Sequence, residues 1–133
     1  MKNEYLKPRV IAEIGCNHKG EMEIAKQLLK VAADSGVEVA KFQKRNNKEL
    51  LTKEQYNTPH PNPINSYGNT YGEHREFLEF NLNQHQELKE YAESLGLIYS
   101  TSVWDTTSAK EIASINPDLI KVPSACNNHF EML

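Results

Sequence analysis

The stretch V-E-V-A-K-F-Q, residues 37–43, decides the fold class because it predicts a largely apolar strand directly after an amphipathic helix. The helix opens at Glu21 and Gly36 ends it; its apolar stripe follows the i, i+3, i+4, i+7 spacing and consists of Ala25, Leu28, Leu29 and Ala32. Residues 9–15, R-V-I-A-E-I-G, predict another strand before this helix. Strand, helix and strand in this order predict a parallel pair with a right-handed crossover.

The same alternation continues toward the C-terminus. Asn83 and Gln86 match a capping box, which predicts a helix that ends at Gly96. Further strands are expected over residues 97–103 and 119–124, with a short helix capped by Asp105 between them and another helix starting at Asn128. Such an order is typical of an α/β fold with parallel (βα) units, either an open doubly wound sheet or part of a (βα)8 barrel. The sequence argues against a dinucleotide-binding form of the doubly wound sheet, because no G-x-G-x-x-G motif follows the first strand.

Residues 44–82 form a long connection interrupted by proline and glycine, with short helical pieces expected at 48–56 and 73–80. Connections of this length in compact domains are usually functional loops or linkers. Because this one leaves the C-terminal end of the second strand, we expect it to overhang a site there.

Length and composition fit a single folded domain over residues 1–133, with 25% charged and 38% hydrophobic residues. A net charge of −3 gives no argument for binding nucleic acid or an anionic membrane, and the apolar runs are too short to span a bilayer. Cys16 and Cys126 match neither a zinc spacing nor a disulfide framework. We therefore expect a reduced cytoplasmic protein.

Lys41 and Lys121 stand near the C-terminal ends of predicted strands, at what we expect to be equivalent depth. A lysine inside a buried strand is costly unless it meets an anion, so the pair predicts a site for a small polyanion. The alternative is that each lysine reaches solvent or pairs with a carboxylate such as Glu13. Glu13 could bind a sugar hydroxyl, act as an acid or base, or serve as that structural partner, and its position favours none of these.

The five histidines show no metal-ligand spacing. We expect each to be solvated and assign none as a ligand; they are His18, His60, His74, His85 and His129.

Four ordered motifs at the strand ends resemble those of the N-acetylneuraminate (sialic acid) synthase family. They are I-A-E-I-G-C-N-H-K-G at residues 11–20, K-F-Q at 41–43, S-T-S at 100–102 and K-V-P-S-A-C-N-N at 121–128. The resemblance implies that residues 1–133 are the first half, about four strands, of a TIM-type (βα)8 barrel, with an active-site loop over 44–82. Two departures stand at the third strand, where Ser102 replaces a proline and Val103-Trp104 replaces a phenylalanine.

The resemblance also implies an enzyme that condenses phosphoenolpyruvate with N-acetylmannosamine or a related N-acetylhexosamine and releases phosphate. It implies phosphoenolpyruvate contacts from Lys41, Thr101, Lys121 and Ser124, a sugar contact from Glu13, and weaker candidates in Gln43 and Asn128. Of these, Glu13, Lys41 and Lys121 are the expected catalytic residues. A divalent metal, manganese or magnesium, and a homodimer are implied as well. The family's metal histidines belong to later strands, so we expect residues 1–133 to be inactive alone.

Two other functions stay open at this point. One is a different phosphoenolpyruvate–aldehyde condensing synthase, against which the N-H-x-G opening argues. The other is a non-catalytic half-barrel that binds an anionic sugar or a partner protein. The motifs do not identify the acceptor sugar.

Overall fold

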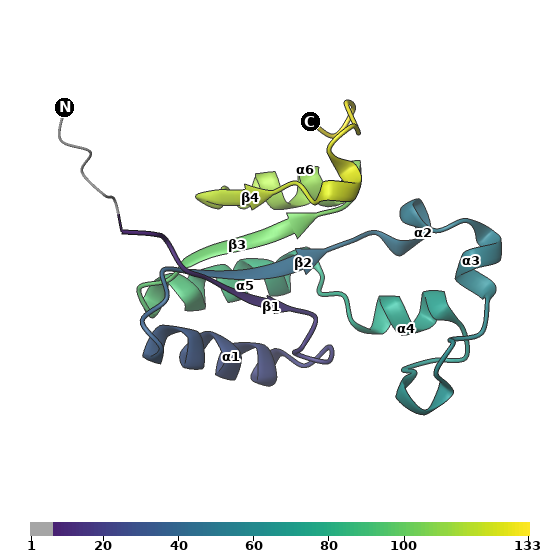
Figure 1. Ribbon diagram of the computed structural model, residues 1–133, viewed down its shortest axis with the longest axis horizontal. Helices are drawn as coiled ribbons and strands as arrows, with labels where there is room; N and C mark the ends of the chain where they lie inside the picture. Colours follow the sequence, from purple (N-terminus) through teal and green to yellow (C-terminus); the bar gives the residue numbers. More distant parts are fainter. Residues whose placement is uncertain (1–6) are drawn as a thin grey trace.

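The structure, a computed structural model, describes residues 7–133 and contains one parallel sheet of four strands in the order β1-β2-β3-β4 (Figure 1). The strands are β1 (Ile11–Gly15), β2 (Val39–Lys44), β3 (Ile98–Val103) and β4 (Leu119–Lys121). Each strand pairs in parallel with the next one in sequence, as in consecutive units of a (βα)8 barrel. The predicted α/β fold with parallel (βα) units is confirmed.

Three helices connect the strands: α1 (Met22–Asp34), α5 (Leu82–Ser94) and α6 (Thr106–Ser114). Figure 1 shows α1 and α5 side by side along one face of the sheet. The predicted stripe of α1 faces this sheet, because Ala25, Leu29 and Ala32 are buried. Among residues 7–133, no helix has the length and apolar character needed to cross a membrane.

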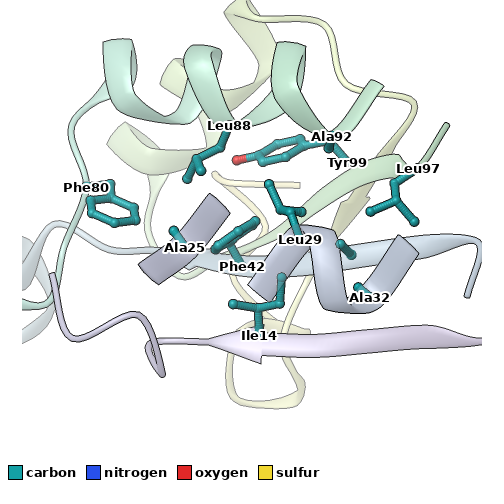
Figure 2. Packing of buried hydrophobic residues seen from close by; sticks show 11 residues of the cluster. Ile14, Ala25, Leu29, Ala32, Phe42, Phe80, Leu88, Ala92, Leu97 and Tyr99 are labelled. Carbon is teal, nitrogen blue, oxygen red and sulfur yellow. The ribbon is translucent and has the colours of Figure 1, made fainter. Parts of the chain in front are cut away.

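The hydrophobic core lies between these helices and the sheet (Figure 2). Ile14, Phe42 and Tyr99 reach into it from β1, β2 and β3, where they meet Leu29 of α1 and Leu88 of α5. Full burial of a side chain of this size contributes about 1.5–3 kcal/mol of stability. The core therefore fixes which face of each strand the helices cover.

Two predicted element boundaries were wrong. Asn81, not Asn83, caps α5: its Oδ1 accepts from the Gln84 backbone N–H at 3.0 Å, and the Gln84 side chain accepts from the Asn81 N–H at 2.9 Å. Both asparagines precede a glutamine by three residues, so the motif alone did not separate them.

The fourth strand is also shorter than predicted, ending at Lys121. Pro123 has no N–H to continue the ladder, and a 3₁₀ turn, η2 (Ser124–Cys126), follows it. The helix expected from Asn128 is absent, since residues 127–133 form turns and irregular chain.

The long connection after β2 is a small helical excursion comprising α2 (Asn47–Leu50), α3 (Lys53–Asn57), the 3₁₀ turn η1 (Pro63–Asn65) and α4 (Tyr71–Phe77). The expected piece at 48–56 is thus divided into α2 and α3. Gly72 lets α4 approach α3, because a Cβ there would lie 2.3 Å from Tyr56 Cδ2. Figure 1 shows α4 beyond the ends of the strands, on the side of the sheet where α1 lies.

The expectation of solvated histidines was wrong for His18 and His85, which are 2% and 0% exposed. His18 stacks on Phe80 with 4.0 Å between ring centroids, and His85 Nδ1 lies 2.6 Å from the Tyr99 hydroxyl. Burial lowers the pKa of His18 to about 4 and the pKa of His85 to about 3. Both imidazoles are therefore neutral parts of the core.

These histidines predict a loss of stability in acid. Their folded-state pKa values lie below the ordinary value of 6.5, so the unfolded chain binds protons first, and stability falls as the pH drops below 6.5 toward 4 and 3. His85→Gln, which keeps a polar group for Tyr99 but does not titrate, should flatten the decline of the melting temperature between pH 6.5 and 4. Thermal unfolding across that range measures the effect.

The half-exposed His129 offers a matched control, since His129→Gln makes the same replacement but leaves the contact between His85 and Tyr99 in place. Parallel profiles for wild type and His85→Gln would contradict this account of the core.

Candidate active site

Alternation along β2 divides its side chains between two faces of the sheet. Ala40 and Phe42 belong to the helix-covered core, so Lys41 and Gln43 project from the opposite face. In the strand register Lys41 lies opposite Glu13 of β1 and Ser100 of β3. This opposite face, which we call the open face, carries the polar residues of neighbouring strands.

Lys41 is the most confined charge on the open face, with 6% of the residue exposed. Its ammonium group forms an ion pair with Glu13, and it donates to Ser102 Oγ at 3.5 Å. The carboxylate compensates a charge that would otherwise be costly to bury. Glu13 is therefore the structural partner of Lys41, yet 57% of its side chain is exposed and stays within reach of a ligand.

Lys121 lines the same cleft as Lys41 and Glu13. The cleft has a volume of about 470 Å³, and its other walls are Ile11, Leu119, Ile120 and Val122. Lys121 lies opposite Ser102, two residues beyond the level of Ser100 and Lys41, and is exposed. The expected equal depth is wrong: one lysine is buried and compensated, and the other stands nearer the strand ends.

Thr101 does not join this cleft. It is 0% exposed and lies opposite Phe42 in the register, which places it on the helix-covered face. The polar side chain that β3 brings to Lys41 is Ser102, which the motif comparison did not select. The alternation from Tyr99, a core aromatic, could have identified it, because residues 100 and 102 share the face opposite Tyr99.

Two further candidates lie outside the cleft. Ser124 and Asn128 are exposed in the turns after β4, and neither lines the cleft. The helical excursion also stays outside, because none of its residues contributes to these walls. The expectation that residues 44–82 overhang a site at the strand ends stays a prediction.

Gly15 ends β1 in a turn with φ of +57°, a conformation that favours glycine. A Cβ at this position would lie 3.2 Å from Gln43 Nε2 and 3.7 Å from Glu13 Oε1. Gly15 thus lets Gln43 come close to Glu13. The side chains of Gln43 and Glu13 thus both lie next to Gly15, at the end of β1.

Arg45, directly after β2, is a buried cation beside Gln43 that sequence reasoning did not select. It is 8% exposed, donates to the Gln43 side-chain oxygen, and lies with its guanidinium carbon 4.7 Å from the centre of the Trp104 ring. Glu79, at the end of the excursion, accepts from the Arg45 backbone N–H at 3.0 Å and lies 3.6 Å from the guanidinium. No local sequence signal marks these contacts.

Burial shifts the pKa values of both Glu79 and Arg45. It raises the pKa of Glu79 to about 7, although Arg45 opposes the rise, and it lowers the pKa of Arg45. An arginine stays protonated in proteins, so Arg45 is a fixed cation whose partner titrates near neutral pH.

The sequence model of the NeuB family matches residues 28–133. The chain belongs to the NeuB family. It is 36% identical over 124 residues to the N-acetylneuraminate-9-phosphate synthase of Homo sapiens, covering 93% of the chain and 34% of that protein. It is 28% identical over 118 residues to the N,N'-diacetyllegionaminic acid synthase of Campylobacter jejuni, covering 89% of the chain and 35% of that protein. The chain thus spans about a third of the length of these NeuB relatives.

A solved structure has the same fold. The N-acetylneuraminic acid synthetase of Leptospira borgpetersenii, in complex with citrate, superimposes with a TM-score of 0.69 at 22% identity, over 90% of this chain and 38% of that one. The resemblance to sialic acid synthases is confirmed, and the four strands are the first half of a TIM-type barrel.

The described part of the chain does not fit a metal centre. Residues 7–133 hold no group of three or more His, Cys, Asp or Glu side chains that could bind an ion. The divalent metal implied by the NeuB resemblance stays a prediction.

A comparison of alanine substitutions at Gly15 and Gly36 distinguishes the effect of backbone strain from the effect of crowding at the site. Both have positive φ, but a Cβ on Gly36 would meet nothing within 4 Å. Each glycine-to-alanine change should lower stability by about 1–2 kcal/mol through the left-handed backbone. Only Gly15→Ala should also displace the Gln43 side chain and so weaken the binding of a ligand that Gln43 contacts.

Thermal unfolding and calorimetric titration of both variants measure the two effects. Equal ligand affinities for Gly15→Ala and Gly36→Ala would place the Gly15 turn outside the site.

Proposed function

We propose that the protein carrying this chain condenses phosphoenolpyruvate with N-acetylmannosamine or a related N-acetylhexosamine and releases phosphate. The observation that carries the proposal is the cleft in which Lys41 and Lys121 share one open face with Glu13. Synthases of N-acetylneuraminate 9-phosphate and of N,N'-diacetyllegionaminic acid among its relatives support the same chemistry.

The two lysines provide the anion side of the proposed site. Phosphoenolpyruvate carries a phosphate and a carboxylate, and ammonium groups bind both through charge-assisted hydrogen bonds. Lys121, exposed on the cleft wall, is the first cation that an arriving anion would meet. Lys41 lies deeper, and Ser102 adds a hydroxyl donor beside it.

Glu13 and Gln43 provide the sugar side. The exposed part of the Glu13 carboxylate accepts hydrogen bonds, as a sugar hydroxyl requires, and repels a second anion. In the proposed reaction C3 of phosphoenolpyruvate bonds to the aldehyde carbon of the open-chain sugar, and water adds at C2. The bond from C2 to the phosphate oxygen then breaks, which leaves a keto group and free phosphate. Lys41 and Lys121 would compensate the charge of the phosphate throughout.

A cytoplasmic location and a homodimer belong to this proposal as expectations from the resemblance. Manganese or magnesium belongs to it in the same way.

Lys121→Ala should raise the KM for phosphoenolpyruvate and lower kcat, each at least tenfold, in the protein expressed from its complete reading frame. Removing one hydrogen bond to a charged group costs about 1.5–3 kcal/mol, which corresponds to one to two decades in rate. Phosphate release with both substrates present is the measurement. Lys110→Ala, an exposed lysine on α6, is the matched control and should behave as wild type. Wild-type kinetics in Lys121→Ala would remove Lys121 from the site.

Glu13→Gln should impair use of the aminosugar while phosphoenolpyruvate affinity is kept or increased. The substitution removes a sugar-side acceptor and also the negative charge that compensates Lys41. Separate KM values for the two substrates test this. A matching loss for both would assign Glu13 a structural role alone.

A further inference from the structure

Arg45 collects contacts from four separate parts of the chain. Its guanidinium meets Gln43 of β2, the Trp104 ring after β3 and Glu79 before α5, and Nη1 lies 3.9 Å from Cys16 Sγ in the turn after β1. Holding a charged side chain at 8% exposure costs free energy, so a plain surface arginine would not be confined in this way. The Trp104 ring, over which the guanidinium lies, fixes the direction of the guanidinium, while Glu79 accepts its hydrogen bond from the Arg45 backbone N–H.

This direction determines the orientation of the Gln43 amide. A guanidinium has only N–H donors, so it can bind Gln43 only through the side-chain oxygen Oε1. The amide NH₂ is then the group that faces Gly15, where Nε2 lies 3.2 Å from the position of a Cβ. Glu13 Oε1 lies 3.7 Å from the same position. The open face therefore presents a hydrogen-bond donor, from Gln43, next to an acceptor, from Glu13.

A donor beside a carboxylate suits a neutral ligand that has both kinds of group, such as the hydroxyls and acetamido oxygen of an aminosugar. It does not suit a polyanion, which the carboxylate would repel. The cations that suit phosphoenolpyruvate are Lys41 and Lys121, on the cleft itself.

We propose that Arg45 is a positioning residue that holds the Gln43 amide with its NH₂ toward the aminosugar, and that it sets affinity for this substrate. The inference rests on the proposed function, since it assigns the sugar side of the same site. Arg45 acts through Gln43 and does not itself touch the sugar.

A double-mutant cycle on the protein expressed from its complete reading frame tests the proposal. Gln43→Ala and Arg45→Met should each raise the KM for N-acetylmannosamine about tenfold, with less than a threefold change in the KM for phosphoenolpyruvate. The double variant should be no worse than Gln43→Ala, because Arg45 has nothing left to orient. Multiplied effects in the double variant, or a wild-type sugar KM in either single one, would overturn the proposal.

Glu79→Gln separates positioning from a general role in folding. It weakens the tie between Arg45 and the excursion but leaves the hydrogen bond to Gln43, so the sugar KM should stay within threefold of wild type. A tenfold rise there would contradict the assignment to Gln43. If Arg45→Met does not fold, as judged by thermal unfolding, Arg45→Lys replaces it in the cycle; this variant keeps a donor-only cation and should recover part of the sugar affinity.

The wild-type protein reports on the proposed function independently. Failure to release phosphate from phosphoenolpyruvate in the presence of N-acetylmannosamine would refute the condensation itself. If the wild-type protein is active but the effects of Gln43→Ala and Arg45→Met multiply in the double variant, only the role of Arg45 is refuted.

Discussion

The ion pair between Lys41 and Glu13 is the interaction on which the arrangement of the open face depends. Lys41 occupies the middle of β2 between the apolar residues Ala40 and Phe42, which the helices bury on the other face. Its charge can be held there only because Glu13, at the same level of β1, supplies the opposite charge. The parallel register that brings these two side chains together also aligns Ser100 with them, and it places Ser102 on the same face, within hydrogen-bond reach of Lys41. The core on one face and the charged cleft on the other are therefore two consequences of the same strand pairing.

Much of the fold could be predicted because its signals are local. The stripe of α1 and the apolar strands follow periods of 3.6 and 2 residues, which depend only on the backbone geometry of a helix and a strand. Where two local signals competed, the prediction was wrong. Asn81 and Asn83 both satisfy the capping-box spacing, and the placement of Phe80 in the core favours the earlier start. Pro123 ended β4 where the apolar pattern alone would have extended it.

The site was predicted less completely, because faces and distant contacts decide it. Lys41 and Lys121 were found from their charge, whereas Thr101 was assigned by motif and lies on the helix-covered face with Tyr99, so its ligand contact stays a prediction. The buried histidines have their partners in Phe80 and Tyr99, and in each case the decisive contact joins different elements. Arg45 follows the same rule, since its partners Glu79 and Trp104 lie far away in sequence, Glu79 by 34 residues. The sequence pattern of a single turn or strand does not indicate such a contact.

The charges of the cleft imply that the two lysines attract an anion to different degrees. Lys41 is already compensated by Glu13, so its field outside the pair is weak, whereas no carboxylate within residues 7–133 forms an ion pair with Lys121. An approaching anion is therefore attracted first by Lys121, and it gains full contact with Lys41 only when Glu13 shifts its hydrogen bonding toward another donor. An aminosugar hydroxyl is such a donor. In the proposed reaction this carboxylate would therefore connect the two halves of the site, because a sugar bound at Glu13 would release part of the charge of Lys41 toward phosphoenolpyruvate.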